Sequence, residues 1–253
     1  MPRLDGRVAL ITGGESGIGL ETARLFVAEG ARVHLAGIDA PALEAAGREL
    51  GPDAAATTVC DVTDGDRVRT AVAEAVARFG PLDVLFSNAG ISGAIGTPIP
   101  DYPDDVFARV LAVHVVGAFN VLKHALPAMR DGGSVIITSS VVGLTGVAGA
   151  AGYVTAKHAQ VGLMRTAAKE AAPRRIRVNT IHPGPTDTAF QHAIEMTATG
   201  APKERAAEIF EQMIPLRRHA SPAEIARSVL YLACDDSSFV TGATLAVDGG
   251  MSG

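Results

Sequence analysis

A tyrosine and a lysine lie four residues apart in the stretch from Ser140 to Lys157, and this spacing suits proton transfer. On a helix, it places the side chains of Tyr153 and Lys157 on one face. A phenol alone has a pKa of about 10, and a neighbouring ammonium group lowers that pKa towards neutral pH. Ser140 follows an apolar run over 134–139 that is typical of a buried strand. The stretch therefore predicts an acid/base site made of Ser140, Tyr153 and Lys157.

A surface tyrosine and lysine on an ordinary helix give the same pattern, so the surrounding elements must decide between the two interpretations. The glycine-rich turn T-G-G-E-S-G-I-G at Thr12 to Gly19 follows an apolar run and precedes a helical pattern. This order is the context that a dinucleotide fingerprint requires. Gly13 permits a tight turn, Gly17 lets backbone approach a pyrophosphate, and Gly19 lets the helix pack closely. The N–H groups of that helix would face the phosphates.

Apolar runs typical of buried parallel strands alternate with helical patterns along the chain. The expected strands span 7–12, 32–36, 55–61, 82–87, 133–139, 176–181 and 243–247. The expected helices span 20–29, 41–50, 64–79, 104–129, 153–172 and 222–234. The alternation predicts an α/β fold, a Rossmann-type doubly wound parallel sheet with helices on both faces. Without a repeat or linker, 1–253 is expected to be a single dinucleotide-binding domain, in which an insertion at 189–218 acts as a substrate-binding lid.

Each conspicuous short motif stands at the carboxyl end of an expected strand. These motifs are Asp61-Val62, Asn88-Ala89-Gly90, Ser140 and Pro183-Gly184. Doubly wound sheets bind ligands at this edge, so the shared location favours one common cleft. Asn88 and Gly90 could instead simply turn the chain.

The composition narrows the classes of function. The chain of 253 residues has a net charge of −5 and no block rich in lysine and arginine, so nucleic acid is not an expected partner. No signal-peptide pattern is present, and no apolar run is expected to reach the length that spans a bilayer, so a cytoplasmic protein without membrane contact is expected. Cys60 and Cys234 lie in unrelated surroundings and predict neither a disulfide nor a metal site.

Together these motifs resemble the classical short-chain dehydrogenase/reductase (SDR) family along nearly the whole chain. The matching motifs are the glycine turn, Asp61-Val62, Asn88-Ala89-Gly90, Ser140, Y-V-T-A-K at 153–157 and P-G-P-T-D-T at 183–188. The resemblance implies an NAD(P)-dependent oxidoreductase that interconverts a secondary alcohol and a ketone by hydride transfer. Tyr153 would be the acid/base, Lys157 would lower its pKa and bind the nicotinamide ribose, and Ser140 would orient the substrate oxygen.

The resemblance also implies a set of cofactor-binding residues. Asp61 and Val62 would hold the adenine, and Thr188 would reach the carboxamide or a phosphate, although it could also simply cap the next segment. The implied set is Gly13, Ser16, Gly17, Ile18, Gly19, Asp61, Val62, Asn88, Ala89, Gly90, Tyr153, Lys157, Pro183, Gly184, Thr186 and Thr188.

The end of the second strand departs from the family pattern and bears on the choice of cofactor. Members that prefer NAD usually carry Asp at the position of Gly37, and members that prefer NADP often carry Arg at Ile38 or a basic residue near Ser16. This sequence has neither signature, and Asp39 lies two positions late, so it reaches the ribose only if the turn bends. Glu15 puts negative charge near the place of a 2′-phosphate, and we therefore expect NAD rather than NADP.

His114 is a second departure, because the family usually has Asn at this helical position. That Asn helps to hold a water that links the lysine to solvent, and a neutral imidazole could hold the same water. A protonated imidazole would instead oppose Lys157 and shape the acid side of the pH profile. We therefore place His114 with the catalytic residues. The alternatives are that it only packs in the core, and that the chain is a cofactor-binding protein with weak or no turnover.

The substrate is expected to be a small molecule, apolar or mixed rather than phosphorylated. The candidate pocket residues are Ile91, Ile95, Val141, Val142, Leu144, Val147, Phe190, Ile194, Met196, Phe210, Met213 and Ile214. An enoyl reductase is disfavoured. In that branch of the family the Tyr and the Lys are six residues apart, whereas the residue six positions after Tyr153 is Ala159.

A homotetramer is expected, partly from the resemblance and partly from the two longest helices. Both are rich in small and apolar residues, which a single sheet cannot cover completely. Examples are Ala112, Val116, Ala118, Ala159, Val161 and Ala167.

Overall fold

Seven parallel strands form one sheet in the order β3-β2-β1-β4-β5-β6-β7 in the computed structural model, which describes residues 2–253. The chain order reverses at β1 and β4, the kind of switch point at which such sheets form a ligand crevice. This confirms the predicted doubly wound parallel sheet. The strands span Val8–Thr12 (β1), Arg32–Gly37 (β2), Ala55–Val59 (β3), Leu82–Ser87 (β4), Met129–Thr138 (β5), Arg177–Pro183 (β6) and Thr244–Val247 (β7).

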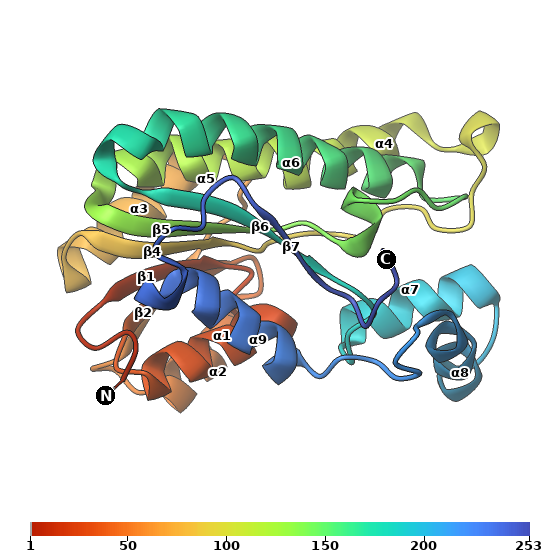
Figure 1. The fold of residues 1–253 in the computed structure, drawn as a ribbon, viewed down its shortest axis with the longest axis horizontal. Helices are drawn as coiled ribbons and strands as arrows, with labels where there is room; N and C mark the ends of the chain where they lie inside the picture. The colour runs from red at the N-terminus through yellow and green to blue at the C-terminus, as the bar shows by residue number, and fades with distance from the viewer. Residues whose placement is uncertain (1) are drawn as a thin grey trace.

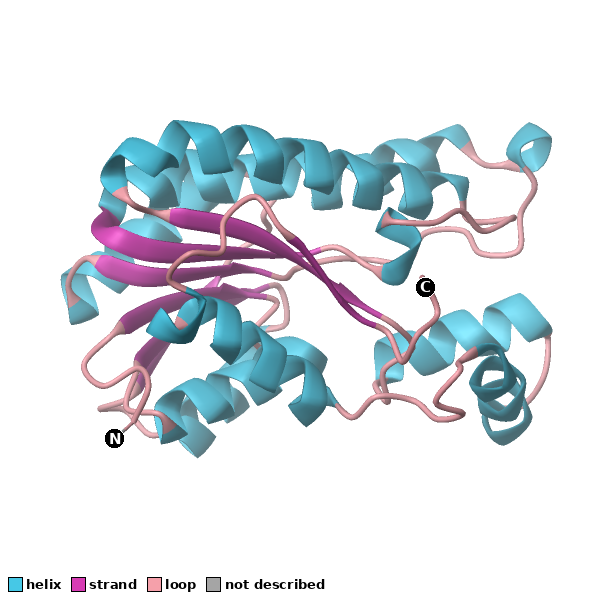
Figure 2. Ribbon diagram, in the orientation of Figure 1, coloured by secondary structure: helices cyan, strands magenta, loops and turns pink. Residues whose placement is uncertain are grey.

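Helices cover both faces of the sheet (Figures 1 and 2). One face carries α1 (Gly17–Ala28), α2 (Ala40–Leu50) and α9 (Pro222–Ala233). The other carries α3 (Gly65–Phe79), α4 (Asp104–Leu111), α5 (Gly117–Ala125) and α6 (Ala151–Ala171).

Two hydrophobic cores, one on each face, explain why the strands appear in the sequence as unbroken apolar runs. Along β1, Val8 and Leu10 pack into the core under α3, α5 and α6, whereas Ala9 and Ile11 pack into the core over α1, α2 and α9. A strand buried on both sides has no polar face, so no alternation with polar residues is needed.

The helix expected over 104–129 is interrupted. A π-helical segment, Ala112–Val116, joins α4 to α5 and contains His114. A 3₁₀ turn, Leu126–Ala128, follows α5, and β5 begins at Met129, earlier than the expected 133. A π-helical segment is a single-turn irregularity within an apolar helix, so the spacing of apolar residues does not reveal it.

The helical stretch Asp104–Ala128 is long and apolar enough to cross a membrane by length and composition, contrary to the expectation from the sequence. Its most apolar window has a mean hydropathy of 1.6, and 39% of that window is buried. A core helix passes the same test, and here α4 packs against α6 and α5 packs against α3. The stretch is part of the helical layer of this domain.

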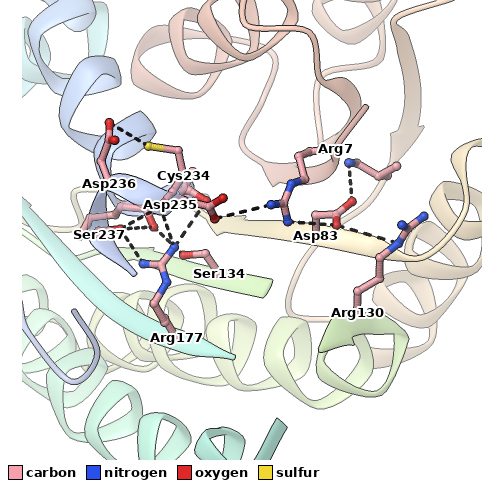
Figure 3. A network of polar contacts seen from close by, with 12 residues as sticks. Arg7, Asp83, Arg130, Ser134, Arg177, Cys234, Asp235, Asp236 and Ser237 are labelled. Carbon is pink, nitrogen blue, oxygen red and sulfur yellow. Dashed lines mark hydrogen bonds and ion pairs between the residues drawn. The ribbon is translucent and has the colours of Figure 1, made fainter. Parts of the chain in front are cut away.

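A polar network ties the amino ends of the strands together, at the edge opposite the sequence motifs (Figure 3). The buried carboxylate of Asp83 accepts hydrogen bonds from the Val8 backbone N–H at 2.9 Å and from Arg7 Nη1 at 3.5 Å. Arg177, at the start of β6, donates to Ser237 Oγ at 2.6 Å. Because these buried charges are paired, they stabilise this edge and leave the carboxyl edge for ligands.

The insertion expected at 189–218 forms two helices, α7 (Ala189–Thr199) and α8 (Lys203–Met213). Figure 1 shows them side by side next to the ends of β6 and β7. We call α7 and α8 the lid helices.

Candidate active site

A cavity of about 760 Å³ runs along the carboxyl ends of the strands. Nearly all of the expected site residues line it, although they come from distant parts of the chain. They are Gly13, Ser16, Gly17, Ile18, Asp61, Val62, Asn88, Ala89, Gly90, His114, Ser140, Tyr153, Lys157, Pro183, Gly184, Thr186 and Thr188. Gly19 and Asp39 are outside this lining.

The glycine turn has the conformation and the free donors that a diphosphate requires. Gly13 and Gly17 have φ values of +63° and +51°, in the left-handed region that favours glycine. The Ser16 side chain makes no capping hydrogen bond to α1, so it leaves the first-turn N–H groups available to an anion. Gly19 lies beneath the turn, where a Cβ would collide with the Gly13 carbonyl, so its role is close packing rather than contact with a ligand.

Asn88 connects three strands and does more than turn the chain. Its backbone N–H donates to Thr12 Oγ1 at 2.9 Å, and its Nδ2 donates to the Gly13 carbonyl at 3.3 Å. Its Oδ1 accepts from Thr138 Oγ1 at 3.0 Å. The Thr138 carbonyl in turn accepts from Lys157 Nζ at 2.8 Å. The glycine turn and the lysine are therefore joined by one set of hydrogen bonds.

Tyr153 and Lys157 lie in the first two turns of α6 and face the cavity together. Lys157 Nζ is 5.3 Å from the centre of the Tyr153 ring. The Lys157 side chain is buried, and its backbone carbonyl accepts a hydrogen bond from Ser139 Oγ at 3.0 Å. Ser140 caps a short 3₁₀ turn, where its Oγ accepts from the Val142 N–H at 3.4 Å.

Burial shifts the pKa values of both groups against their charged forms. It raises the pKa of Tyr153 to about 12, with the nearby Ser140 hydroxyl acting in the opposite direction. Burial also lowers the pKa of Lys157 to about 7. The expected lowering of the tyrosine pKa by the lysine is therefore not found, because desolvation of the phenol dominates and only the Ser140 hydrogen bond opposes it. At neutral pH, Tyr153 carries its proton.

His114 is a neutral, buried residue that packs against Tyr153. The two rings are edge to face, with centres 5.4 Å apart. His114 Nε2 lies 2.7 Å from the Ile91 carbonyl oxygen and 3.1 Å from the Ile91 nitrogen, so either tautomer can form one of these hydrogen bonds. A Cβ at Gly90 would collide with the ring, which explains the glycine there. Burial, and secondarily Lys157, lowers the pKa of His114 to about 3. The imidazole is therefore neutral at neutral pH, as expected, but its titration lies too far down to shape the acid side of the pH profile as the sequence predicted.

Gln160 lies behind the cavity wall, where it supports His114, and it is not among the residues predicted from the sequence. Its Nε2 donates to the His114 carbonyl at 3.0 Å, within the π-helical segment. Gln160 Oε1 and His114 Nδ1 are both buried without a hydrogen-bond partner. A signal was available, because Gln160 follows Lys157 by three residues and so lies on the same face of α6.

Two of the acids predicted for the adenine end of the cavity differ in position, because Asp61 lines the cavity and Asp39 does not. Asp61 Oδ1 accepts from the Thr63 N–H at 2.9 Å and from Thr63 Oγ1 at 2.8 Å, and the first of these bonds lowers the pKa of Asp61. Asp39 instead accepts from the Ala42 N–H at 3.1 Å and caps α2. The prediction that Asp39 reaches the ribose is therefore wrong, because its carboxylate is held at the N-cap of α2.

The opposite end of the cavity is apolar. It is lined by Ile91, Ile95, Val141, Val142, Val147, Phe190, Ile194, Phe210 and Met213, as expected. Three other expected residues do not line it: Leu144 and Met196 face solvent, and Ile214 is buried elsewhere. Thr188 lines the cavity and also caps α7, where its Oγ1 accepts from the Gln191 N–H at 3.2 Å.

Comparisons with known proteins agree with this geometry. A family model described as Enoyl-(Acyl carrier protein) reductase matches residues 13–252. Momilactone A synthase from Oryza sativa subsp. japonica is 42% identical over 254 residues, which cover 99% of this chain and 91% of that protein.

Solved structures show the same fold over the whole chain. Levodione reductase is 38% identical, with a TM-score of 0.94 and 99% of both chains covered. NAD⁺-bound xylitol dehydrogenase is 38% identical, with a TM-score of 0.92 and 98% of this chain and 100% of that chain covered. A further structure, 33% identical with a TM-score of 0.89, is a complex with NADPH; it covers 99% of this chain and 100% of that one.

Proposed function

The chain belongs to the classical short-chain dehydrogenase/reductase family, and we propose that it interconverts a secondary alcohol and a ketone with Tyr153 as the proton donor and acceptor. One observation carries the proposal. Tyr153, Ser140 and the buried Lys157 line a single cavity whose wall also contains the glycine turn. A proton-transfer group and a dinucleotide site in one cavity are what this reaction needs.

The residues of this cavity fit a nicotinamide cofactor, which supplies or accepts the hydride when bound. The first-turn N–H groups of α1 would hold the diphosphate. Asp61 and Val62 would hold the adenine, Lys157 the nicotinamide ribose, and Thr188 the carboxamide or a phosphate. Asn88, Ala89 and Gly90 would form the wall behind the cofactor, together with Pro183, Gly184 and Thr186, which line the same cavity.

Tyr153 acts on the substrate oxygen. As a protonated phenol at neutral pH, it donates a hydrogen bond to a ketone oxygen and then gives up its proton as negative charge develops there. Ser140 donates a second hydrogen bond to the same oxygen and orients it. The ammonium form of Lys157 stabilises the phenolate that remains. In the reverse direction the phenolate removes the alcohol proton, so alcohol oxidation requires a higher pH than ketone reduction.

We propose that the substrate is uncharged and largely apolar. The lining residues at that end of the cavity are aliphatic and aromatic. Among residues 2–253, the lysine and arginine in the lining are Lys157 and Arg109, and Arg109 lies 3.9 Å from Asp61 at the other end. A phosphorylated substrate would therefore meet no cation of its own.

Two alternatives make different predictions. Reduction of a carbon–carbon double bond matches the description of the family model, but the four-residue spacing of Tyr153 and Lys157 favours a carbonyl substrate. A cofactor-binding protein with weak turnover is the second alternative, motivated by His114 in contact with Tyr153. We further propose a preference for NAD, a homotetrameric assembly and a cytoplasmic location.

A substrate panel tests the function. Purified protein is assayed with cyclic and linear ketones, their alcohols, a phosphorylated ketose and an enoyl thioester, each with both nicotinamide cofactors. We expect turnover of apolar ketones and alcohols, and none of the phosphorylated ketose. Turnover of the enoyl thioester alone would contradict the carbonyl assignment, and cofactor binding without any turnover would support the second alternative.

A further inference from the structure

The end of β2 contains a carboxylate that comes from a different loop. In dinucleotide-binding folds, an acid about 20 residues after the glycine motif binds the adenosine ribose. The chain has Gly37 and Ile38 at this place, and both line the cavity. Glu15, from the glycine turn, lines the same part of the wall.

The Glu15 side chain occupies the space that a side chain at position 37 would need. A Cβ added to Gly37 would collide with all three atoms of the Glu15 carboxylate. Gly37 has no left-handed φ, so its backbone conformation does not explain the glycine. A side chain at position 37 would therefore have to displace the Glu15 carboxylate, which is the end of a flexible side chain.

The two oxygens of this carboxylate have different surroundings. Glu15 Oε1 accepts a hydrogen bond from the Ile38 N–H at 3.2 Å, which holds the side chain in place. Glu15 Oε2 is buried and has no hydrogen-bond partner within the part of the chain that the structure describes. A buried acceptor without a donor is costly, so Oε2 is suited to a ligand that brings a hydroxyl group.

We propose that Glu15 selects NAD over NADP by accepting a hydrogen bond from the adenosine ribose, in place of an acid at the end of β2. The selection has two parts, because a ribose hydroxyl donates to Oε2 whereas a 2′-phosphate brings negative charge against it. The inference rests on the proposed function, since it requires a nicotinamide dinucleotide in the cavity. It also assigns Gly37 as the position that makes room for Glu15.

Calorimetric titration with NAD⁺ and NADP⁺ tests the inference without an activity assay. The measured quantity is the selectivity ratio, the Kd for NADP⁺ divided by the Kd for NAD⁺. Glu15→Gln keeps the size of the side chain and an acceptor for the Ile38 N–H, but it removes the charge. We expect the ratio to fall at least about tenfold, as for loss of a charged hydrogen-bond partner. A purely structural Glu15 predicts an unchanged ratio, and that result would overturn the inference.

Asp39→Asn is the matched control. It removes a carboxylate two residues from Gly37 and keeps a residue that caps α2 well. We expect the selectivity ratio of this variant to equal that of the wild type. A loss of selectivity in Asp39→Asn with none in Glu15→Gln would assign the role to Asp39 and overturn the inference.

An exchange of positions tests the link between Glu15 and Gly37. Gly37→Asp alone is expected to displace the Glu15 carboxylate and to bind both cofactors weakly, because two carboxylates then share one space. Glu15→Ala lowers the selectivity ratio, and Glu15→Ala/Gly37→Asp is expected to restore it at least about tenfold over Glu15→Ala. No recovery in a folded double variant would contradict the exchange. A wild type that binds neither dinucleotide would overturn the proposed function itself, whereas an unselective wild type would overturn only this inference.

Discussion

At the scale of single residues, burial separates the pKa values of the two groups that the reaction uses. Burial raises the pKa of Tyr153 to about 12 and lowers the pKa of Lys157 to about 7. On raising the pH, Lys157 loses its proton well before Tyr153 does. Tyr153 therefore keeps a proton that it can donate over a wide range of pH. Lys157 is a cation mainly near or below neutral pH, and there it stabilises the phenolate most.

Tyr153→Phe removes only the hydroxyl that transfers the proton. We expect kcat to fall by about 10²-fold or more, the usual contribution of a general acid, with the Kd of the dinucleotide changed by less than about threefold. Steady-state kinetics and calorimetry measure the two quantities. Near-normal kcat in this variant would show that another group supplies the proton.

His114→Asn tests whether His114 titrates during catalysis or only packs against Tyr153. Because the pKa of His114 is about 3, it stays neutral over the working range and adds no ionisation to the acid side of the pH profile. We expect the pH dependence of kcat/KM to keep its shape, while its height changes because the edge-to-face contact with Tyr153 is lost. The measurement is a pH profile of both proteins. A shift of the acid limb in the variant would show that His114 does titrate there.

The sequence predicted which residues meet but not the environment in which they meet. Ser140, Tyr153 and Lys157 were found from spacing and position relative to the strands. The pKa of Tyr153 was predicted in the wrong direction, since spacing carries no information on desolvation. Glu15 was recognised as a charge, but its contact with Gly37 depends on how two loops fold together.

At the scale of elements, strand–turn–helix units were predictable because their signals are local. Glycine turns, apolar runs and caps marked most boundaries to within a few residues. The π-helical segment at Ala112–Val116 was not predictable from local signals, because Gln160 on α6 donates a hydrogen bond to the His114 carbonyl from outside that helix. The lid was expected as a mixed segment, but its hydrogen bond between Glu195 and His219 joins residues that are far apart in the sequence.

His219 joins the lid helices through a buried polar cluster. Its Nε2 lies 2.6 Å from Glu195 Oε1 on α7, and its Nδ1 lies 3.2 Å from Glu211 Oε1 on α8. Gln191 also donates to Glu195 Oε1, at 2.9 Å. Both ring nitrogens face acceptors, so only the protonated imidazole donates to both carboxylates. Burial alone would lower the pKa of His219, but the hydrogen bonds to Glu195 and Glu211 outweigh it and raise the pKa.

The lid is expected to loosen as pH rises. A pKa raised by folding stabilises the folded lid fully below the unfolded value of about 6.5, and this stabilisation is lost as pH rises through the folded pKa. Hydrogen exchange of α7 and α8, corrected for intrinsic rates, should therefore show more protection at about pH 6 than at about pH 9. His219→Gln should remove this dependence on pH.

His192→Gln is the matched control for the lid. His192 Nε2 lies 2.9 Å from Asp187, whose side chain is exposed, so this pair contributes little. We expect the pH dependence of lid protection to persist in this variant. Equal pH dependence in His219→Gln and the wild type would show that the buried cluster does not respond to pH.

At the scale of the whole molecule, two groups of exposed apolar side chains lie outside the lining of the cavity. Val116 and Phe119, at the π-helical segment and α5, are 47% and 50% exposed. Phe239 is fully exposed before β7, which is an edge strand, and Tyr231 on α9 is 38% exposed. Because α5 and α9 cover opposite faces of the sheet, one two-fold interface cannot cover both surfaces. Two distinct two-fold interfaces give a D₂ tetramer.

The six helix residues that the sequence predicts for this assembly differ in burial, and Ala112 and Ala159 are half-buried. Ala118, Val161 and Ala167 are buried in the core of the subunit and are not available to a partner. Val116 does face outwards, as expected. The sequence shows that each of these residues is small or apolar, but it does not show which side of the helix the sheet covers.

We expect light scattering to show a tetramer at micromolar concentration. A charged substitution in one interface should disrupt that interface and leave the other intact. Val116→Asp should remove the contact at α5, and Phe239→Asp should remove the contact at the β7 edge, so each variant should be a dimer and the double variant a monomer. Ala73→Asp, on the exposed surface of α3, is the control and should remain tetrameric. A monomeric wild type would exclude the assembly. Two single variants that stay tetrameric would show that the interfaces lie elsewhere on the surface.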